Sequence, residues 1–170
     1  THFRKWKRME DSKKKDDDDT KIRSPPRSPK DVVAFTDKVL KKLLGLQSHE
    51  DQIELLNSIS RGEGYGDSGT ERGLCFVEFT FSNVHFVLEK KIKTQLALVF
   101  IKSMNTAFRH AVKTNWDQRD ESFRRFKEVI LNYCKYSNVN LKEAHMMTDF
   151  ATRTLFRVFH LFRNIFVAES

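Results

Sequence analysis

Few residues of this sequence can interrupt or cross-link the chain. Of its 170 residues, three are proline, two are cysteine and six are glycine. Cys75 and Cys134 are too few and too far apart for a zinc site or a small disulfide scaffold. We expect two free thiols, with a single disulfide as the alternative. The sequence also lacks a run of about 18 apolar residues, so no transmembrane helix is predicted.

Patterns that carry chemistry are absent as well. No two histidines stand three or four residues apart, so no helix would offer two imidazoles to a metal on one face. There is no nucleophile elbow and no family-specific Cys/His signature. Gly62 and Gly64 follow a predicted helix rather than a strand and lack the Lys-Ser/Thr of a phosphate-binding loop. We therefore predict no catalytic residue, no metal site, no cofactor and no enzymatic activity.

What the sequence does have is an uneven distribution of charge. Residues 1–30 hold 11 Lys+Arg and 6 Asp+Glu, whereas residues 31–170 hold 20 and 17. All three prolines also lie in the first segment. Because this segment has few apolar side chains to bury, we expect residues 1–30 to be a disordered charged tail and residues 31–170 to form the folded domain.

The tail is a candidate electrostatic arm. It would attract an acidic protein, an acidic polymer or an anionic membrane, and the alternative is a purely solubilising tail. Nucleic acid ranks behind these partners because the rest of the chain is near neutral. Ser24 and Ser28 each precede a proline and are candidate phosphorylation sites, where phosphate would lower the positive charge. The arm residues are Arg4, Lys5, Trp6, Lys7, Arg8, Lys13, Lys14 and Lys15.

The remainder of the chain reads as helices. The 97 residues after Gly73 contain neither glycine nor proline, which predicts an all-α fold, a compact bundle of about five helices. Residues 62–73 are predicted to be a glycine-rich loop. Residues 74–81 alternate like a strand, but a lone strand would have no partner, so a helix or an extended packing segment is favoured. Apolar periodicity and capping residues place the five helices at about 29–45, 48–62, 83–114, 117–134 and 140–166.

The last predicted helix has the most distinctive composition. Its phenylalanines alternate with cations, a pattern typical of a helix that docks in a groove or lies on a membrane, and also of a core helix with a polar stripe. Its apolar arc looks wider than one neighbouring helix can cover, which would leave an exposed patch. Arg119, Arg124, Arg125 and Lys127 of the preceding helix would extend a positive rim. The predicted surface for a partner or membrane consists of Phe156, Phe159, Phe162, Phe166, Arg153, Arg157 and Arg163.

Together these features favour a non-enzymatic helical binding module. It would engage a protein partner through the Phe-rich helical surface, assisted by the basic arm. The alternative is a secreted basic helical effector that acts at a cell surface or membrane. In architecture and composition alone, such a chain resembles gastropod sperm lysins and four-helix cytokines. Both a secreted and an intracellular location fit the sequence, and so does any oligomeric state.

Overall fold

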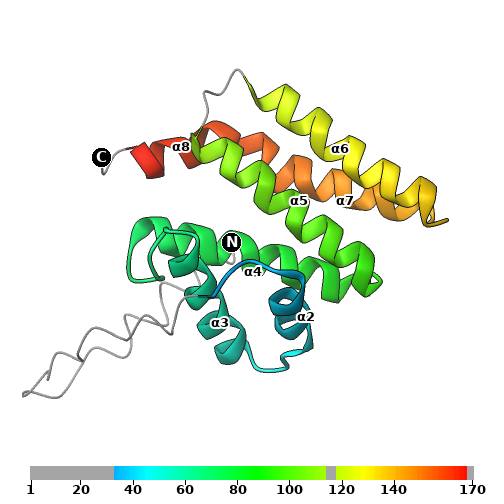
Figure 1. Ribbon diagram of the computed structural model, residues 1–170. Helices are drawn as coiled ribbons and strands as arrows, with labels where there is room; N and C mark the ends of the chain where they lie inside the picture. The colour runs from blue at the N-terminus through cyan, green and yellow to red at the C-terminus, as the bar shows by residue number, and fades with distance from the viewer. Residues whose placement is uncertain (1–32, 114–117, 168–170) are drawn as a thin grey trace, which may run out of the picture. The chain divides into compact units, whose positions relative to one another are not determined.

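A computed structural model describes residues 33–113 and 118–167 of the chain (Figure 1). The described residues form helices and contain no strand, which confirms the predicted all-α class. The helices outnumber the five that were predicted. In chain order they are α2 (Asp37–Gly45), α3 (His49–Gly62), α4 (Glu71–Glu89), α5 (Thr94–Lys113), α6 (Arg119–Tyr136), α7 (Leu141–Thr154), the 3-10 turn η3 (Phe156–Val158) and α8 (Phe159–Val167).

Capping side chains fix several helix starts. Ser48 precedes α3 and accepts a hydrogen bond from the backbone N–H of Asp51, as the sequence predicted. The start of α2 differs from the prediction, because residues 33–36 are not helical and Thr36 caps the helix. Instead, the backbone N–H of Val33 donates to the carbonyl of Ser58 on α3 at 3.3 Å. The predicted start at residue 29 itself lies outside the described residues.

The predicted helix over 83–114 is divided into the end of α4 and the whole of α5. Helix α4 also takes in residues 74–81, which are helical rather than extended. At its end Lys91 adopts a left-handed φ of 52°, and the Ile92 N–H donates to the Val87 carbonyl at 3.0 Å. This bond closes a Schellman motif, which terminates a helix. Ile92 is buried against the core, so packing stabilises a stop that neither glycine nor proline marks.

The predicted helix over 140–166 is also divided, near Leu155. Thr148, Thr152 and Thr154 of α7 donate their hydroxyls to carbonyls four residues earlier at 2.7–2.8 Å, a pattern that bends helices. After the bend the Phe156 carbonyl accepts a hydrogen bond from Nε of Arg119 on α6, at 2.6 Å. The break lets α8 follow a direction of its own and pack against α5 and α4.

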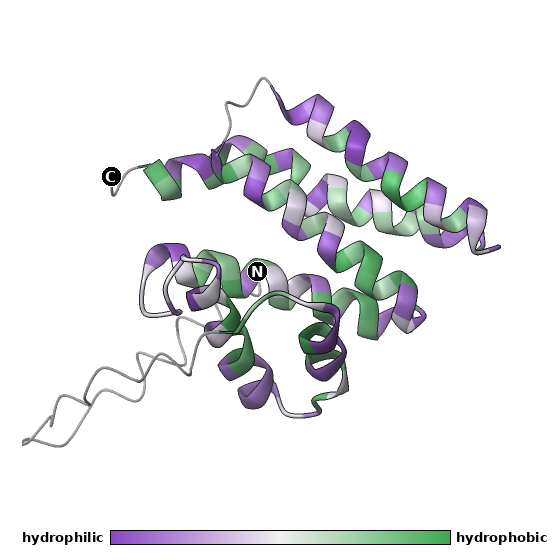
Figure 2. Cartoon of the chain, viewed as in Figure 1, coloured by the Kyte–Doolittle hydropathy of each residue, from purple (hydrophilic) through white to green (hydrophobic). Residues whose placement is uncertain are grey.

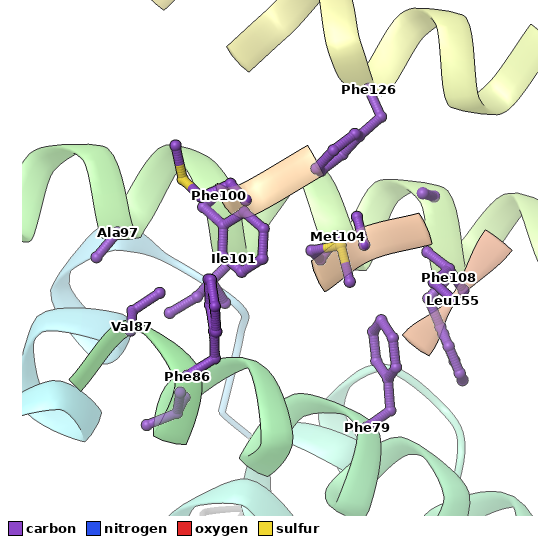
Figure 3. Packing of buried hydrophobic residues seen from close by; sticks show 14 of the residues in the cluster. Phe79, Phe86, Val87, Ala97, Phe100, Ile101, Met104, Phe108, Phe126 and Leu155 are labelled. Atoms are coloured by element: carbon purple, nitrogen blue, oxygen red, sulfur yellow. The ribbon is translucent and has the colours of Figure 1, made fainter. Parts of the chain in front are cut away.

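The hydrophobic core is built around α5, which contacts α2, α4, α6 and α8. Figure 3 shows Phe79 and Phe86 of α4 pointing toward α5 side chains that include Phe100, Met104 and Phe108. The rings of Phe79 and Phe108 stack with centroids 4.7 Å apart. Aromatic rings of α4 and α5 therefore pack directly against each other in this core.

The glycine-rich segment is shorter than predicted, because only residues 63–70 lie between α3 and α4. Gly64 and Gly66 have φ values of 83° and 82°, which glycine adopts without strain. Gly73 belongs to the first turn of α4, and a Cβ atom there would overlap the Asp67 carbonyl. Gly66 and Gly73 therefore allow the loop to pack closely on the helix, whereas Gly64 has open space around it and is suited by its φ alone.

Aromatic packing holds this loop on the body. The Tyr65 ring lies 5.0 Å from Phe76 and 5.2 Å from Phe166, measured between centroids. The Ser68 N–H donates to Oδ1 of Asn57 at 2.7 Å. The loop therefore links α3, α4 and α8.

Candidate protein-binding surface

The four phenylalanines that were predicted to dock a partner do not lie together on the surface. Phe156 and Phe159 are each 1% exposed. The Phe156 ring lies 4.7 Å from Phe123 and 5.8 Å from Phe126, both on α6. Phe156 therefore packs η3 against α6, and a partner cannot reach either side chain in the folded chain.

Phe162 and Phe166 are half-buried and also face inward. Their rings lie 5.1 Å and 5.7 Å from Phe108 of α5. In addition, Arg72 of α4 donates a hydrogen bond to the Phe166 carbonyl at 2.7 Å. Phe162 and Phe166 therefore do not form the expected exposed patch, because α4, α5 and the loop after α3 contact them. The large apolar side chains that α8 does expose are Leu161 and Val167.

The three arginines of the same segment differ in their exposure and in their partners. Arg153 is exposed and pairs with Asp149 at 2.7 Å, one turn earlier on α7. Arg157 is exposed, whereas Arg163 is half-buried. They therefore form no rim around exposed phenylalanines.

The positive rim predicted on α6 is largely neutralised. Arg124 and Arg125 both donate hydrogen bonds to Glu121, and these bonds lower the pKa of that carboxyl. Lys127 lies over the Phe123 ring at 4.7 Å, and Arg119 is engaged with the Phe156 carbonyl. Most of these cations on α6 are therefore engaged by other groups of the same chain.

The predicted electrostatic arm lies outside the described residues. This applies to Arg4, Lys5, Trp6, Lys7, Arg8, Lys13, Lys14 and Lys15 and to the candidate phosphorylation sites Ser24 and Ser28.

Neither cysteine has the properties of a reactive thiol. Cys75 and Cys134 are both free, so the alternative of a disulfide between them is wrong. Burial raises the pKa of Cys75 to about 12 and also raises the pKa of Cys134. The thiolate is the nucleophilic form, so both groups are poor nucleophiles at neutral pH.

No group of three or more His, Cys, Asp or Glu side chains in the described part of the chain could hold a metal ion. No helix in those residues is long and apolar enough to cross a bilayer.

Large apolar side chains do reach the surface at the turn that joins α6 to α7. Tyr136, the last residue of α6, is 82% exposed, and Leu141, the first of α7, is 61% exposed. Lys135 and Lys142 flank them and are exposed as well. We call these four residues the hairpin tip. In Figure 1, α6 and α7 run side by side and this turn lies at the end far from α8.

Backbone hydrogen bonds and a helix cap fix the conformation of the turn at the hairpin tip. The Val139 N–H donates to the Cys134 carbonyl at 3.1 Å across Asn138, whose φ is 51°, so α6 ends in a Schellman motif. Asn140 then caps α7 by accepting a hydrogen bond from the Lys142 N–H at 3.0 Å. Val139 packs against the core. The turn therefore presents Tyr136 from a fixed backbone.

Helix α6 continues this surface away from the turn. Its ribbon is largely hydrophilic, with hydrophobic residues in the second half (Figure 2). Val129 lies two turns before Tyr136 on the same side of the helix and is exposed. Ile130 faces the core instead.

The sequence contained a signal for the hairpin tip that the prediction did not use. Tyr136 falls in the interval between the helices predicted at 117–134 and 140–166, and Leu141 falls at the start of the second, where apolar side chains have few neighbours to pack against.

Comparison with protein families gives one match. The model of the family described as flagellar C1a complex subunit C1a-32 matches residues 82–170, which is more than half of the chain. The chain belongs to this C1a-32 family. No curated protein sequence and no solved structure shows significant similarity to the chain.

The C1a-32 match covers a defined part of the fold. It begins within α4 and includes α5, α6, α7 and α8, and therefore the hairpin tip. Helices α2 and α3 and the loop after α3 precede the match. The family description names a subunit of a protein complex, which agrees with a role in protein binding.

Proposed function

We propose that the chain is a non-enzymatic subunit of a flagellar protein complex and that its helical body binds another subunit. The observation that carries this proposal is the C1a-32 family match over residues 82–170, because the family is described as a complex subunit and not by a reaction. The flagellum is the location that follows from the same description.

The structure supports this role through the way in which the body is built. Five large aromatic or aliphatic side chains of α5 are at most 1% exposed, which gives the domain a rigid centre that other helices surround. A rigid domain keeps its surface side chains in place before a partner arrives, so less conformational entropy is lost on binding. The five side chains are Leu96, Phe100, Ile101, Met104 and Phe108.

The basic segment 1–30 retains its proposed role as an electrostatic arm. Its excess of Lys+Arg over Asp+Glu would speed the encounter with an acidic partner, and this effect weakens as salt rises. Deleting residues 1–30 should lower the association rate at low salt and have little effect on it at high salt. An unchanged rate at low salt would rule out the arm.

Fractionation of flagella tests the function itself. The tagged full chain is expressed in a flagellated cell that lacks its own copy, and isolated flagella are extracted with detergent. We expect the chain to remain with the insoluble skeleton and, after salt extraction, to sediment with other subunits in a particle far larger than its own 20.1 kDa. Recovery as a free monomer in the detergent extract would contradict the proposal.

The other reading of the sequence was a secreted effector acting at a membrane. The Phe-rich segment on which its membrane contact depended is directed into the core of the described domain. The proposal of a complex subunit rests on the family match, and it requires no membrane contact.

A further inference from the structure

We infer that the hairpin tip is a docking site for an acidic amphipathic helix of a partner subunit. This inference rests on the proposed function, because it assumes that the chain binds another protein of its complex. It adds the surface that makes the contact and the chemistry of the segment that is bound.

The first argument is exposure of apolar area. Tyr136 at 82% and Leu141 at 61% are the most exposed large hydrophobic side chains of the described residues. They lie at the two ends of a turn of only four residues, so they share one end of the α6–α7 hairpin. Aromatic side chains presented in this way are enriched at the centres of protein interfaces, since they bury a large area with few rotatable bonds.

The second argument is rigidity. The Schellman motif at Asn138 and the Asn140 cap satisfy backbone groups on both sides of the turn. Nζ of Lys135 lies 5.9 Å from the centroid of the Tyr136 ring, within the range of a cation–π contact. The tip is therefore organised before binding, which reduces the entropic cost of a complex.

The third argument is charge, and it selects the partner. The stretch from Leu131 to Lys142 contains two lysines and no acidic residue, and Glu143, which follows it, is half-buried. Among the described residues neither Lys135 nor Lys142 forms an ion pair, in contrast to Arg124, Arg125 and Arg153. Two unneutralised ammonium groups beside two apolar side chains are complementary to a helix with apolar residues on one stripe and Asp or Glu beside it.

The exposed apolar surface also extends along α6, far enough for a partner helix to bind there. Val129 is 47% exposed and stands seven residues before Tyr136, so the two side chains are two turns apart on one side of α6. A partner helix that lies along this side would contact Val129 and Tyr136 with successive turns and reach the lysines at the turn.

Photo-crosslinking in the assembled complex identifies the occupant. Tyr136 of the full chain is replaced by p-benzoylphenylalanine in flagellated cells, Leu88 is replaced in the same way as an exposed control on α4, and the crosslinked peptides are sequenced. We expect position 136 to crosslink to a helical peptide of another subunit that is rich in Asp and Glu, and position 88 not to crosslink to that peptide. A crosslink to a second copy of this chain, to its own Asp16–Asp19 run or to a peptide without acidic residues would overturn the inference, as would the absence of any crosslink.

Charge reversal tests the lysines in the same cells. The double variant K135E and K142E should lower incorporation into the complex about tenfold or more, because like charges would then face each other. The matched control K41E and K42E makes the same change of net charge on exposed lysines of α2 and should incorporate within about twofold of the wild type. Equal incorporation of the two double variants would refute the docking site.

The two proposals fail in different ways. If the wild-type chain does not sediment with a flagellar complex, the proposed function is wrong. If the wild type incorporates and the variants at the tip do so equally well, the function stands and only the docking site is wrong. Circular dichroism of each purified variant, with a melting temperature within about 2 °C of the wild type, shows that the substitutions leave the fold intact.

Discussion

Replacing Phe156 by alanine separates a core residue from a docking residue. The sequence pattern assigned this side chain to a partner surface, whereas the structure leaves it 1% exposed among aromatic rings. Its ring centroid lies 4.7 Å from Phe123, 5.8 Å from Phe126 and 6.0 Å from Phe159. Alanine would remove one member of this cluster and leave a cavity between α6 and η3.

The magnitude follows from the burial. Buried Phe to Ala substitutions cost about 3–5 kcal/mol, which combines the lost transfer free energy with the unfilled cavity. For a domain of this size each kcal/mol lowers the melting temperature by roughly 2–4 °C, so we expect Phe156→Ala to melt roughly 6–20 °C below the wild type. The neighbouring Arg157 is exposed, and Arg157→Ala should change the free energy of unfolding by less than about 0.5 kcal/mol.

Urea denaturation followed by circular dichroism measures both variants, and incorporation into the flagellar complex is measured below the melting temperature. We expect Phe156→Ala to lose stability and to retain incorporation for the fraction that remains folded. A variant that unfolds within about 1 kcal/mol of the wild type and yet fails to incorporate would refute the assignment of this ring to the core.

Three further predictions concern single residues. Lys91→Gly should raise the free energy of unfolding by about 0.5–1 kcal/mol in urea melts because it relieves a φ of 52°, whereas Lys90→Gly, at a right-handed position, should lower it. Gly73→Ala should lower the melting temperature, because its Cβ would overlap the Asp67 carbonyl, whereas Gly45→Ala has free space and should not. Burial raises the pKa of Cys75 to about 12, so above about pH 9 the unfolded chain loses a proton that the folded chain keeps. The free energy of unfolding should therefore fall as pH rises toward 12, and urea melts of Cys75→Ala should show a shallower fall.

Local signals predicted the helices well where a cap or a stop lies in the sequence itself. The helix predicted over 48–62 is observed as His49–Gly62, because Ser48 caps its start and the left-handed Gly64 lets the Tyr65 N–H donate to the Ser60 carbonyl at its end. Asn140 likewise marks the start of α7. The turn between α6 and α7, and with it the hairpin tip, lies where these signals indicate.

The two missed helix breaks depend on contacts that are distant in sequence. The stop at Lys91 requires Ile92 to be buried, and that burial exists only once α4 and α5 pack together. The bend at Leu155 is accompanied by a hydrogen bond from Arg119 of α6 to the Phe156 carbonyl. Neither contact can be derived from the local pattern, which reads as one continuous helix in both places.

The sequence by itself determined that the body is helical, where α3 and α7 begin and which side chains form apolar stripes. Only the tertiary structure decided which stripes are covered. Periodicity fixes a direction relative to the axis of one helix, whereas burial depends on all the neighbours that surround it. For this reason Phe156 and Phe159 lie in the core, although their pattern resembled a docking surface, while Tyr136 and Leu141 stay exposed at a turn that no described helix covers.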